Sequence, residues 1–200
     1  MTELDRAGAA LVIAESGEQS SELLAALGLA GAQPRPVIVV CGGADDLHGP
    51  QLAVAQALLG PAVGQAARQL GAAVVDGGTA VGVMAIMGEE RAAADLPVLL
   101  GVAPAGKVAH PGATGDEGVE LEPHHTHFVL HDSDEWGGET ELLMDIAKDL
   151  AQGAPIVMVL AGGGRVARSE AHAAVARGWP LFLIEGTGGA ADDQDGCQSN

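Results

Sequence analysis

Short, continuous apolar runs, separated by segments with helical periodicity, dominate the pattern of this chain. The seven runs, in order, are ALVIAE, RPVIVVCGG, GAAVVDGG, LPVLLGVAP, THFVLHD, APIVMVLAGGG and WPLFLIEGTGG. Runs without alternating polar positions are typical of strands that are covered on both faces. Between the runs the sequence predicts helices over 20–29, in two pieces within 51–70, and over 80–94, 138–151 and 165–176.

The alternation of strand and helix along the whole chain predicts an α/β fold with a doubly wound, mostly parallel sheet and helices on both faces. Residues 1–193 are expected to form a single domain. Its opening strand–helix unit, 1–32, is expected to pack on the main sheet because it is too small to fold alone. Residues 194–200 are expected to be a mobile tail. The stretch 103–123 breaks the pattern, and loops of that length in compact domains are usually functional or disordered.

Composition and charge exclude several classes of partner. The chain has 27 acidic residues against nine Lys and Arg, a formal net charge of −18, so its field repels nucleic acids and anionic membranes. Two Trp, two Phe and no Tyr provide no stacking platform for single strands. The apolar runs are far shorter than the roughly 20 residues that span a bilayer, and no signal sequence opens the chain. We therefore expect a cytoplasmic protein that binds no nucleic acid and does not insert into membranes.

Glycines gather where the apolar runs end. They are Gly42 and Gly43, Gly77 and Gly78, Gly162 to Gly164, and Gly186, Gly188 and Gly189, with Gly101 and Gly106 near the end of the fourth run. In a parallel sheet these carboxyl ends lie along one edge, where open α/β folds bind ligands. Glycine lets a ligand approach the backbone, and the following helices offer N–H groups to a phosphate. Thr79 suits a helix N-cap or a phosphate contact.

These glycine loops match neither of two common nucleotide-binding motifs. No GK[ST] follows any of them, and none is a complete G-x-G-x-x-G. A P-loop NTPase and an ordinary dehydrogenase are therefore not supported.

Seven segments, in their order and spacing, resemble one known family. They are VIVVCGGA (37–44), DGGTAVGVM (76–84), GVAPAGKV (101–108), HHTHFVLHD (124–132), WGGETEL (136–142), VMVLAGGG (157–164) and EGTGGAAD (185–192). The chain resembles a stand-alone prokaryotic member of the SLOG superfamily, of the LSDAT type, similar to the N-terminal melastatin homology region of TRPM channels. The resemblance implies a Rossmann-like fold and a sensor module that binds ADP-ribose or another NAD-derived nucleotide. It also implies a homo-oligomer.

The resemblance assigns the ligand to the glycine-rich carboxyl edge of the sheet. The candidate ligand-binding residues there are Gly42, Gly43, Ala44, Gly77, Gly78, Thr79, Gly106, Lys107, His110, Gly163, Gly164, Arg165, Gly186, Thr187 and Gly188. The arginines that meet ADP-ribose in the channels are missing, since the corresponding stretches are VAHPG and ELLMD. Lys107, His110, Arg165 and Arg168 are the remaining candidates for a phosphate contact.

An enzymatic alternative rests on the more distant LOG-type phosphoribohydrolases, which cleave nucleoside monophosphates at the glycosidic bond. Their marker is P-G-G-x-G-T-x-x-E. The matching segment here, GGRVARSE (163–170), keeps the first glycines and Glu170 but has Val166 and Ala167 in place of Gly-Thr. Glu170 is thus the candidate catalytic residue of a nucleotide N-glycosidic or phosphoester hydrolase. The simpler interpretation is a solvated carboxylate in the first turn of a helix. A third alternative is an interaction domain whose ligand site has decayed.

Histidines, acidic residues and a tryptophan offer further chemistry. In HHTH, His125 and His127 would share one face of a strand, a workable start for zinc. We prefer a structural role in which the imidazoles bond loop backbone, and we expect no metal site and no required cofactor. A Ca²⁺ or Mg²⁺ ion held between acidic residues and the nucleotide is the one addition we consider. Trp136 is a candidate stacking surface for adenine. Cys41 is expected to be buried and Cys197 to lie in the tail.

Overall fold

The computed structural model describes residues 3–4, 8–15, 17–31, 33–44, 46–94, 96–111, 113 and 118–193. Its main sheet has the order β1-β2-β8-β5-β4-β3-β9-β10, and every neighbouring pair is parallel except β1 and β2. The strands are β1 Glu3–Leu4, β2 Ala10–Ala14, β3 Val37–Gly42, β4 Ala73–Asp76, β5 Leu99–Pro104, β8 His127–His131, β9 Ile156–Ala161 and β10 Leu181–Leu183. All seven predicted strands are confirmed. The short pair β6 Val108–Ala109 and β7 Val119–Glu120 stands apart from this sheet.

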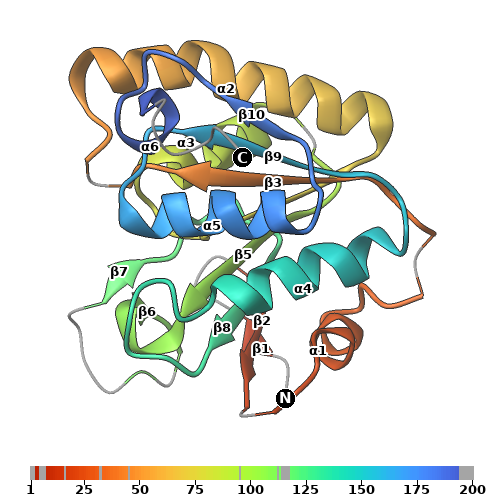
Figure 1. The fold of residues 1–200 in the computed structure, drawn as a ribbon. Helices are drawn as coiled ribbons and strands as arrows, with labels where there is room; N and C mark the ends of the chain where they lie inside the picture. The colour runs from red at the N-terminus through yellow and green to blue at the C-terminus, as the bar shows by residue number, and fades with distance from the viewer. Residues whose placement is uncertain are drawn as a thin grey trace.

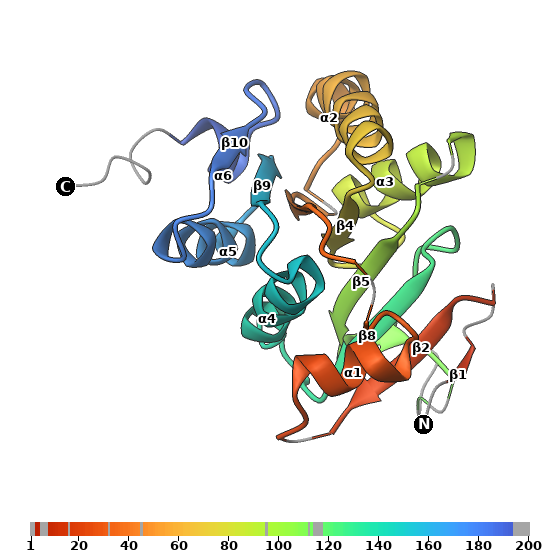
Figure 2. The same cartoon turned by 90° about the vertical axis from the view of Figure 1, so that its right-hand side faces the viewer.

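Helices cover both faces of the sheet, as Figures 1 and 2 show. One face packs against α1 Ser20–Ala26, α4 Thr140–Ala151, α5 Arg165–Ala176 and α6 Gly189–Asp192. The other face packs against α2 Gly49–Leu70 and α3 Gly82–Ala93. The predicted doubly wound α/β class, a Rossmann-like fold, is therefore confirmed.

The alternation of side chains along β3 distributes its residues between the two cores. Val39 and Cys41 lie in the core beneath α4 and α5, whereas Val40 lies in the core beneath α2 and α3. Successive side chains of a strand point to opposite faces. The Cys41 thiol is therefore directed toward α5 at the carboxyl end of β3.

The opening unit joins the same sheet. β2 pairs with β8 over five residues, from Ala10 opposite His127 to Ala14 opposite His131. Helix α1 packs on α4, and the Ser20 hydroxyl donates a hydrogen bond to Asp149 at 2.5 Å. The pairing of β2 with β8 and the packing of α1 on α4 bury the apolar side of a segment that is too small to form a core of its own.

The prediction of two helical pieces within 51–70 is wrong, because α2 is a single helix with Pro61 in its interior. A proline removes one backbone hydrogen bond and usually breaks or kinks a helix. Here Leu59 and Val63, on either side of Pro61, are buried against the same core. Gly60 and Gly64 let α2 approach Ile86 and Glu90 of α3 closely. Packing along the whole helix outweighs the lost hydrogen bond.

Several predicted boundaries shift by a few residues. Helix α3 begins at Gly82 with Val81 as its N-cap, so the prediction of Thr79 as an N-cap is wrong; Thr79 forms an isolated bridge with Leu121 instead. The stretch 103–123 contains the end of β5, the 3₁₀ helix η1 Ala105–Lys107, β6 and β7. Residues 194–200, including Cys197, lie outside the described residues. Within the described part of the chain, no helix has the length and apolar character needed to cross a membrane.

Candidate functional site

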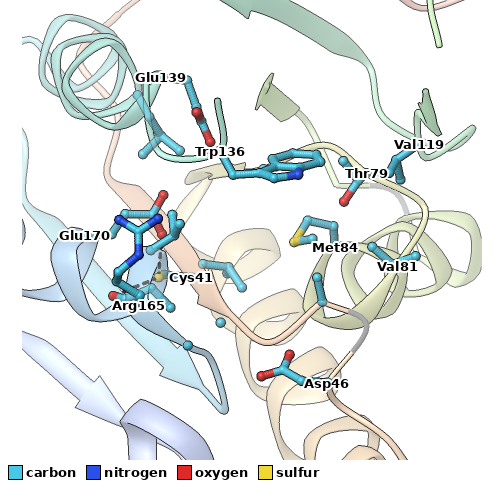
Figure 3. Close-up of a pocket in the computed structure, with 18 of the residues that line it drawn as sticks. Cys41, Asp46, Thr79, Val81, Met84, Val119, Trp136, Glu139, Arg165 and Glu170 are labelled. Atoms are coloured by element: carbon cyan, nitrogen blue, oxygen red, sulfur yellow. Dashed lines mark hydrogen bonds between the residues drawn. The ribbon is translucent and has the colours of Figure 1, made fainter. Parts of the chain in front are cut away.

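A pocket of about 470 Å³ opens at the carboxyl ends of β3 and β4, between α3 and α5 (Figure 3). The predicted site residues that line it are Gly42, Ala44, Gly77, Thr79, Gly164, Arg165 and Glu170. They come from the end of β3, from the loops that follow β3, β4 and β9, and from helix α5. The parallel sheet brings these loops together because its carboxyl ends share one edge.

The apolar side of the pocket is formed by Trp136, Met84, Val81 and Val119. Trp136 belongs to the segment between β8 and α4, and its side chain is 42% exposed. Figure 3 shows its indole ring extending across the pocket toward Thr79 and Met84. An indole with an exposed face is a stacking surface for a planar ring.

A second wall is the N-terminal end of α5. Its N-cap, Gly164, has no side chain to cap the helix, and Gly164, Arg165, Val166 and Ala167 all line the pocket. The first N–H groups of a helix have no partner within the helix and attract negative charge. Arg165 is exposed and is the one Lys or Arg among the described lining residues. This wall therefore suits an anionic group.

Two of the predicted glycines are required by packing around the pocket. A Cβ on Gly42 would collide with the carbonyl oxygen of Ala161, and a Cβ on Gly163 would collide with Ala167. Gly163 also has φ +92°, a backbone conformation that disfavours residues other than glycine. These glycines let the loops after β3 and β9 lie against each other and against α5.

Glu170 is buried at the inner side of the pocket, so its interpretation as a solvated first-turn carboxylate is wrong. It lies on the inward face of α5 with Ala167 and Ala171, and the Cys41 thiol donates a hydrogen bond to its Oε2 at 2.7 Å. Burial raises the pKa of Glu170 to about 7; repulsion from Glu139 and Asp76 adds to this, whereas the bond from Cys41 opposes it. Burial likewise raises the pKa of Cys41 well above its usual value. Glu170 is therefore a carboxyl group that titrates near neutrality.

Glu139 is a lining residue that the sequence patterns did not single out. It is 5% exposed, accepts a hydrogen bond from the Gly137 N–H at 2.9 Å, and burial raises its pKa. In the segment WGGETEL, the sequence offered Trp136 as a candidate site residue but not Glu139. Glu139 precedes α4 and Glu170 belongs to α5. Only the packing of the two helices therefore shows that both side chains line the same pocket.

The family model described as SLOG in TRPM, prokaryote, matches residues 35–199. The chain belongs to this SLOG family. No curated protein matches it in sequence.

The SLOG chain also resembles solved structures. One is the molybdenum cofactor binding protein from the phototrophic bacterium Rippkaea orientalis, with 17% identity, a TM-score of 0.54, and 75% of this chain and 76% of that chain covered. Another is the structural genomics target TM1055, with 21% identity, a TM-score of 0.57, and 78% of each chain covered. At these identities the likeness shows a shared fold.

Other residues that the SLOG resemblance suggested lie outside the pocket lining. They are Gly43, Gly78, Gly106, Lys107, His110, Gly163, Gly186, Thr187 and Gly188. In the loop after β10, the N–H groups of Gly186 and Gly188 each donate to the Asp192 carboxylate at 2.8 Å. The Thr187 hydroxyl accepts a hydrogen bond from Gly162 N–H at 2.7 Å. These groups satisfy one another within the protein.

His125 is not among the pocket-lining residues and lies in a buried cluster with two carboxylates. Its Nε2 donates to Asp76 Oδ1 and its Nδ1 donates to Glu122 Oε2, both at 2.8 Å, and its ring stacks on Phe128. The prediction that His125 and His127 share a strand face is wrong, because His125 precedes β8. Its predicted backbone partners are also wrong: carboxylates hold the ring. Among the described residues, no group of three His, Cys, Asp or Glu could hold a metal ion.

This cluster fixes the position of the loop after β4. Asp76 Oδ1 also accepts the Gly78 N–H at 2.7 Å, and the Glu122 N–H donates to the Gly78 carbonyl at 2.9 Å. Burial lowers the pKa of His125, but the charges and hydrogen bonds of Asp76 and Glu122 together raise it to about 9. The imidazolium thus links β4 to the segment that carries Val119 and Leu121.

Proposed function

We propose that this pocket binds a nucleotide-type ligand, ADP-ribose or another NAD-derived nucleotide, and that the protein acts as a ligand sensor. The observation that supports this most directly is the pairing of a stacking surface, Trp136, with an anion-binding helix end at Arg165 on another wall of one pocket (Figure 3). A planar base and a phosphate are the two groups that these walls suit. Membership of the SLOG family favours a ligand-binding role.

Each wall of the pocket has a distinct role in this proposal. The base stacks on Trp136, and the phosphate meets the first N–H groups of α5 and the Arg165 guanidinium. Glu139 and Glu170 accept hydrogen bonds from ribose hydroxyls or from an exocyclic amine. Asp46, an exposed carboxylate of the wall, would hold Mg²⁺ or Ca²⁺ together with the phosphate.

Tryptophan fluorescence tests the proposal, because the chain has two tryptophans and only Trp136 lines the pocket. In a Trp179→Phe variant, titration with ADP-ribose, cyclic ADP-ribose, NAD, AMP and CMP should change the Trp136 emission for at least one ligand. Calorimetry on the unaltered protein should give the same affinity. If none of the five ligands binds, the nucleotide proposal is overturned.

Two arginines of α5 provide a test of where the phosphate binds. Arg165→Gln should weaken binding about tenfold or more, since a charge-assisted contact to phosphate is lost. Arg168→Gln, which changes an arginine on the same helix that pairs with Asp193, should leave the affinity unchanged. Equal affinities for the two variants would place the phosphate away from α5.

Hydrolysis of the bound nucleotide is a second candidate function, favoured by the position of Glu170. A carboxyl group that titrates near pH 7 inside a pocket can act as a general acid or base. The test follows the NMR spectrum of each ligand in the presence of protein over hours. Release of base, ribose phosphate or AMP that disappears in Glu170→Gln would support hydrolysis, and unchanged ligands would support the sensor function.

A further inference from the structure

The Cys41 thiol lies between the apolar core and the pocket. Cys41 is 3% exposed and belongs to the core beneath α4 and α5, and it also lines the pocket. Its sulfur lies 2.7 Å from Glu170 Oε2 and 3.5 Å from the Ala167 carbonyl oxygen. A thiol has one proton to donate, so the shorter contact identifies Glu170 as its acceptor. Most buried cysteines act only as small apolar residues, and this bond distinguishes Cys41 from them.

The Glu170 carboxyl group is held through one of its two oxygens. Within the described part of the chain, the Cys41 thiol is its one hydrogen-bond partner, and the bond is made to Oε2 (Figure 3). Glu139, the other buried glutamate of the pocket lining, repels Glu170 when both are ionised and so cannot hold it in place. Because Glu170 lines the pocket, its second oxygen, Oε1, is left for a group of the ligand.

We propose that Cys41 is a positioning residue, whose thiol holds Glu170 Oε2 so that Oε1 remains directed into the pocket as the acceptor for a ligand hydroxyl or amine. The inference rests on the proposed nucleotide function, since a ribose hydroxyl and an exocyclic amine are the donors that such a ligand offers. A carboxyl group that is already fixed loses less conformational freedom when the ligand binds. Cys41 thus affects the ligand through Glu170.

The weakness of the thiol as a donor suits this role. A lysine or arginine at this position would form an ion pair and keep Glu170 charged, and an apolar residue would leave a buried carboxyl group without a partner. The thiol is a neutral, weak donor, and with it the pKa of Glu170 is about 7. Burial and the neighbouring Glu170 raise the pKa of Cys41, so the sulfur keeps its proton at neutral pH. Glu170 is therefore oriented without being fixed in one protonation state.

The titration of Glu170 tests this bond without any ligand. Carbon-13 NMR of protein labelled in its glutamate carboxyl groups measures the pKa, and the Glu170 signal is the one that is missing in Glu170→Gln. Cys41→Val removes the donor and should raise the pKa of Glu170, because a hydrogen bond to the charged form is lost. Cys41→Ser retains a donor and should restore the pKa toward that of the unaltered protein. The control Leu160→Val changes the core residue opposite Cys41 on β9, outside the pocket lining, and should leave the pKa of Glu170 unchanged. An unchanged pKa in Cys41→Val overturns the proposal.

Infrared spectroscopy observes the thiol itself. The chain has two cysteines, so in a Cys197→Ser variant the S–H stretching band reports Cys41 alone. A carboxylate is a stronger acceptor than a carboxylic acid, so the band should move to lower frequency as the pH rises through 7 and Glu170 ionises. When Glu170→Gln is added to this variant, the band should not move over the same pH range. A band that is insensitive to pH in the presence of Glu170 would show that the thiol does not donate to this carboxyl group, and the proposal would fail.

Calorimetry near neutral pH tests the effect on the ligand, with the one of the five nucleotides that the unaltered protein binds most tightly. Cys41→Val should weaken binding by about fivefold or more, the equivalent of one hydrogen bond. Cys41→Ser should recover most of this loss, and Leu160→Val should bind as the unaltered protein does. Equal affinities for Cys41→Val and the unaltered protein overturn the positioning role. If the unaltered protein binds none of the five nucleotides, the proposed function fails, whereas the two ligand-free measurements still decide whether Cys41 holds Glu170.

Discussion

Glu170 is a buried carboxyl group that makes the free energy of unfolding depend on pH. Its folded-state pKa of about 7 lies above the usual 4.5 of a glutamate. Its contribution to stability is therefore complete below the unfolded pKa and is lost as the pH rises through 7. Glu170→Gln, which is neutral at every pH, should raise the free energy of unfolding at about pH 8 by on the order of 3 kcal/mol and have little effect near pH 4.5. Urea unfolding at the two pH values measures this.

The control for Glu170 is Glu141→Gln, on the neighbouring helix. Glu141 is exposed and pairs with Arg177, and exposed pairs contribute little to stability. Its stability change should be small at both pH values. A Glu170→Gln effect that is the same at both pH values would contradict the neutral titration of this buried carboxyl group.

His125 is positively charged when protonated, and its contribution to stability is also lost as the pH rises. Its folded pKa of about 9 exceeds the usual 6.5, so its contribution is complete below pH 6.5 and is lost as the pH rises through 9. His125→Ala leaves Asp76 and Glu122 without their buried cation and should cost about 3 to 5 kcal/mol near pH 6.5. The loss should shrink when unfolding is measured near pH 9.5.

His124 is the matched control, because it also bonds Glu122 but its side chain is 48% exposed. His124→Ala should cost far less than His125→Ala near pH 6.5. Equal losses for the two variants would show that the buried position of His125 between two carboxylates has no special effect.

At the scale of elements, helix α2 contains a proline that destabilises the helix locally. Pro61 is exposed in the interior of the helix, where it removes a backbone hydrogen bond and crowds the preceding turn. Pro61→Ala should therefore raise the free energy of unfolding, by about 1 to 3 kcal/mol, without changing the dependence on urea. Pro50, at the start of the same helix, is tolerated there, so Pro50→Ala should be close to neutral. Equal changes in the free energy of unfolding for the two variants would show that the packing of α2 has already removed the destabilising effect of Pro61.

At the scale of the whole molecule, net charge opposes compactness. With a formal charge of −18, the folded chain carries self-repulsion that salt screens. The melting temperature should rise as sodium chloride is increased from low to physiological concentration. A melting temperature that does not change would mean that acidic side chains are spaced widely enough for water to screen them.

Local patterns in the sequence were enough to predict seven strands, their mostly parallel direction and the glycine-rich edge of the sheet, but not the order of the strands. Continuous apolar runs and terminal glycines are local patterns, and parallel pairing brings strand ends to one edge. Helix α5 was predicted with its observed limits because its start follows a glycine loop directly. Helix α2 was not predicted as a single helix, because the tertiary contacts of Leu59 and Val63 outweigh the local effect of Pro61.

Which side chains share the pocket, and whether they are buried or solvated, could be learned only from the three-dimensional packing. Cys41 and Glu170 are 129 residues apart, and Asp76 and His125 are 49 apart; no local pattern relates them. The environment of Glu170, solvated or buried, depends on which face of α5 meets the sheet. Local sequence specifies elements, whereas burial and long-range pairing set the chemistry of their side chains.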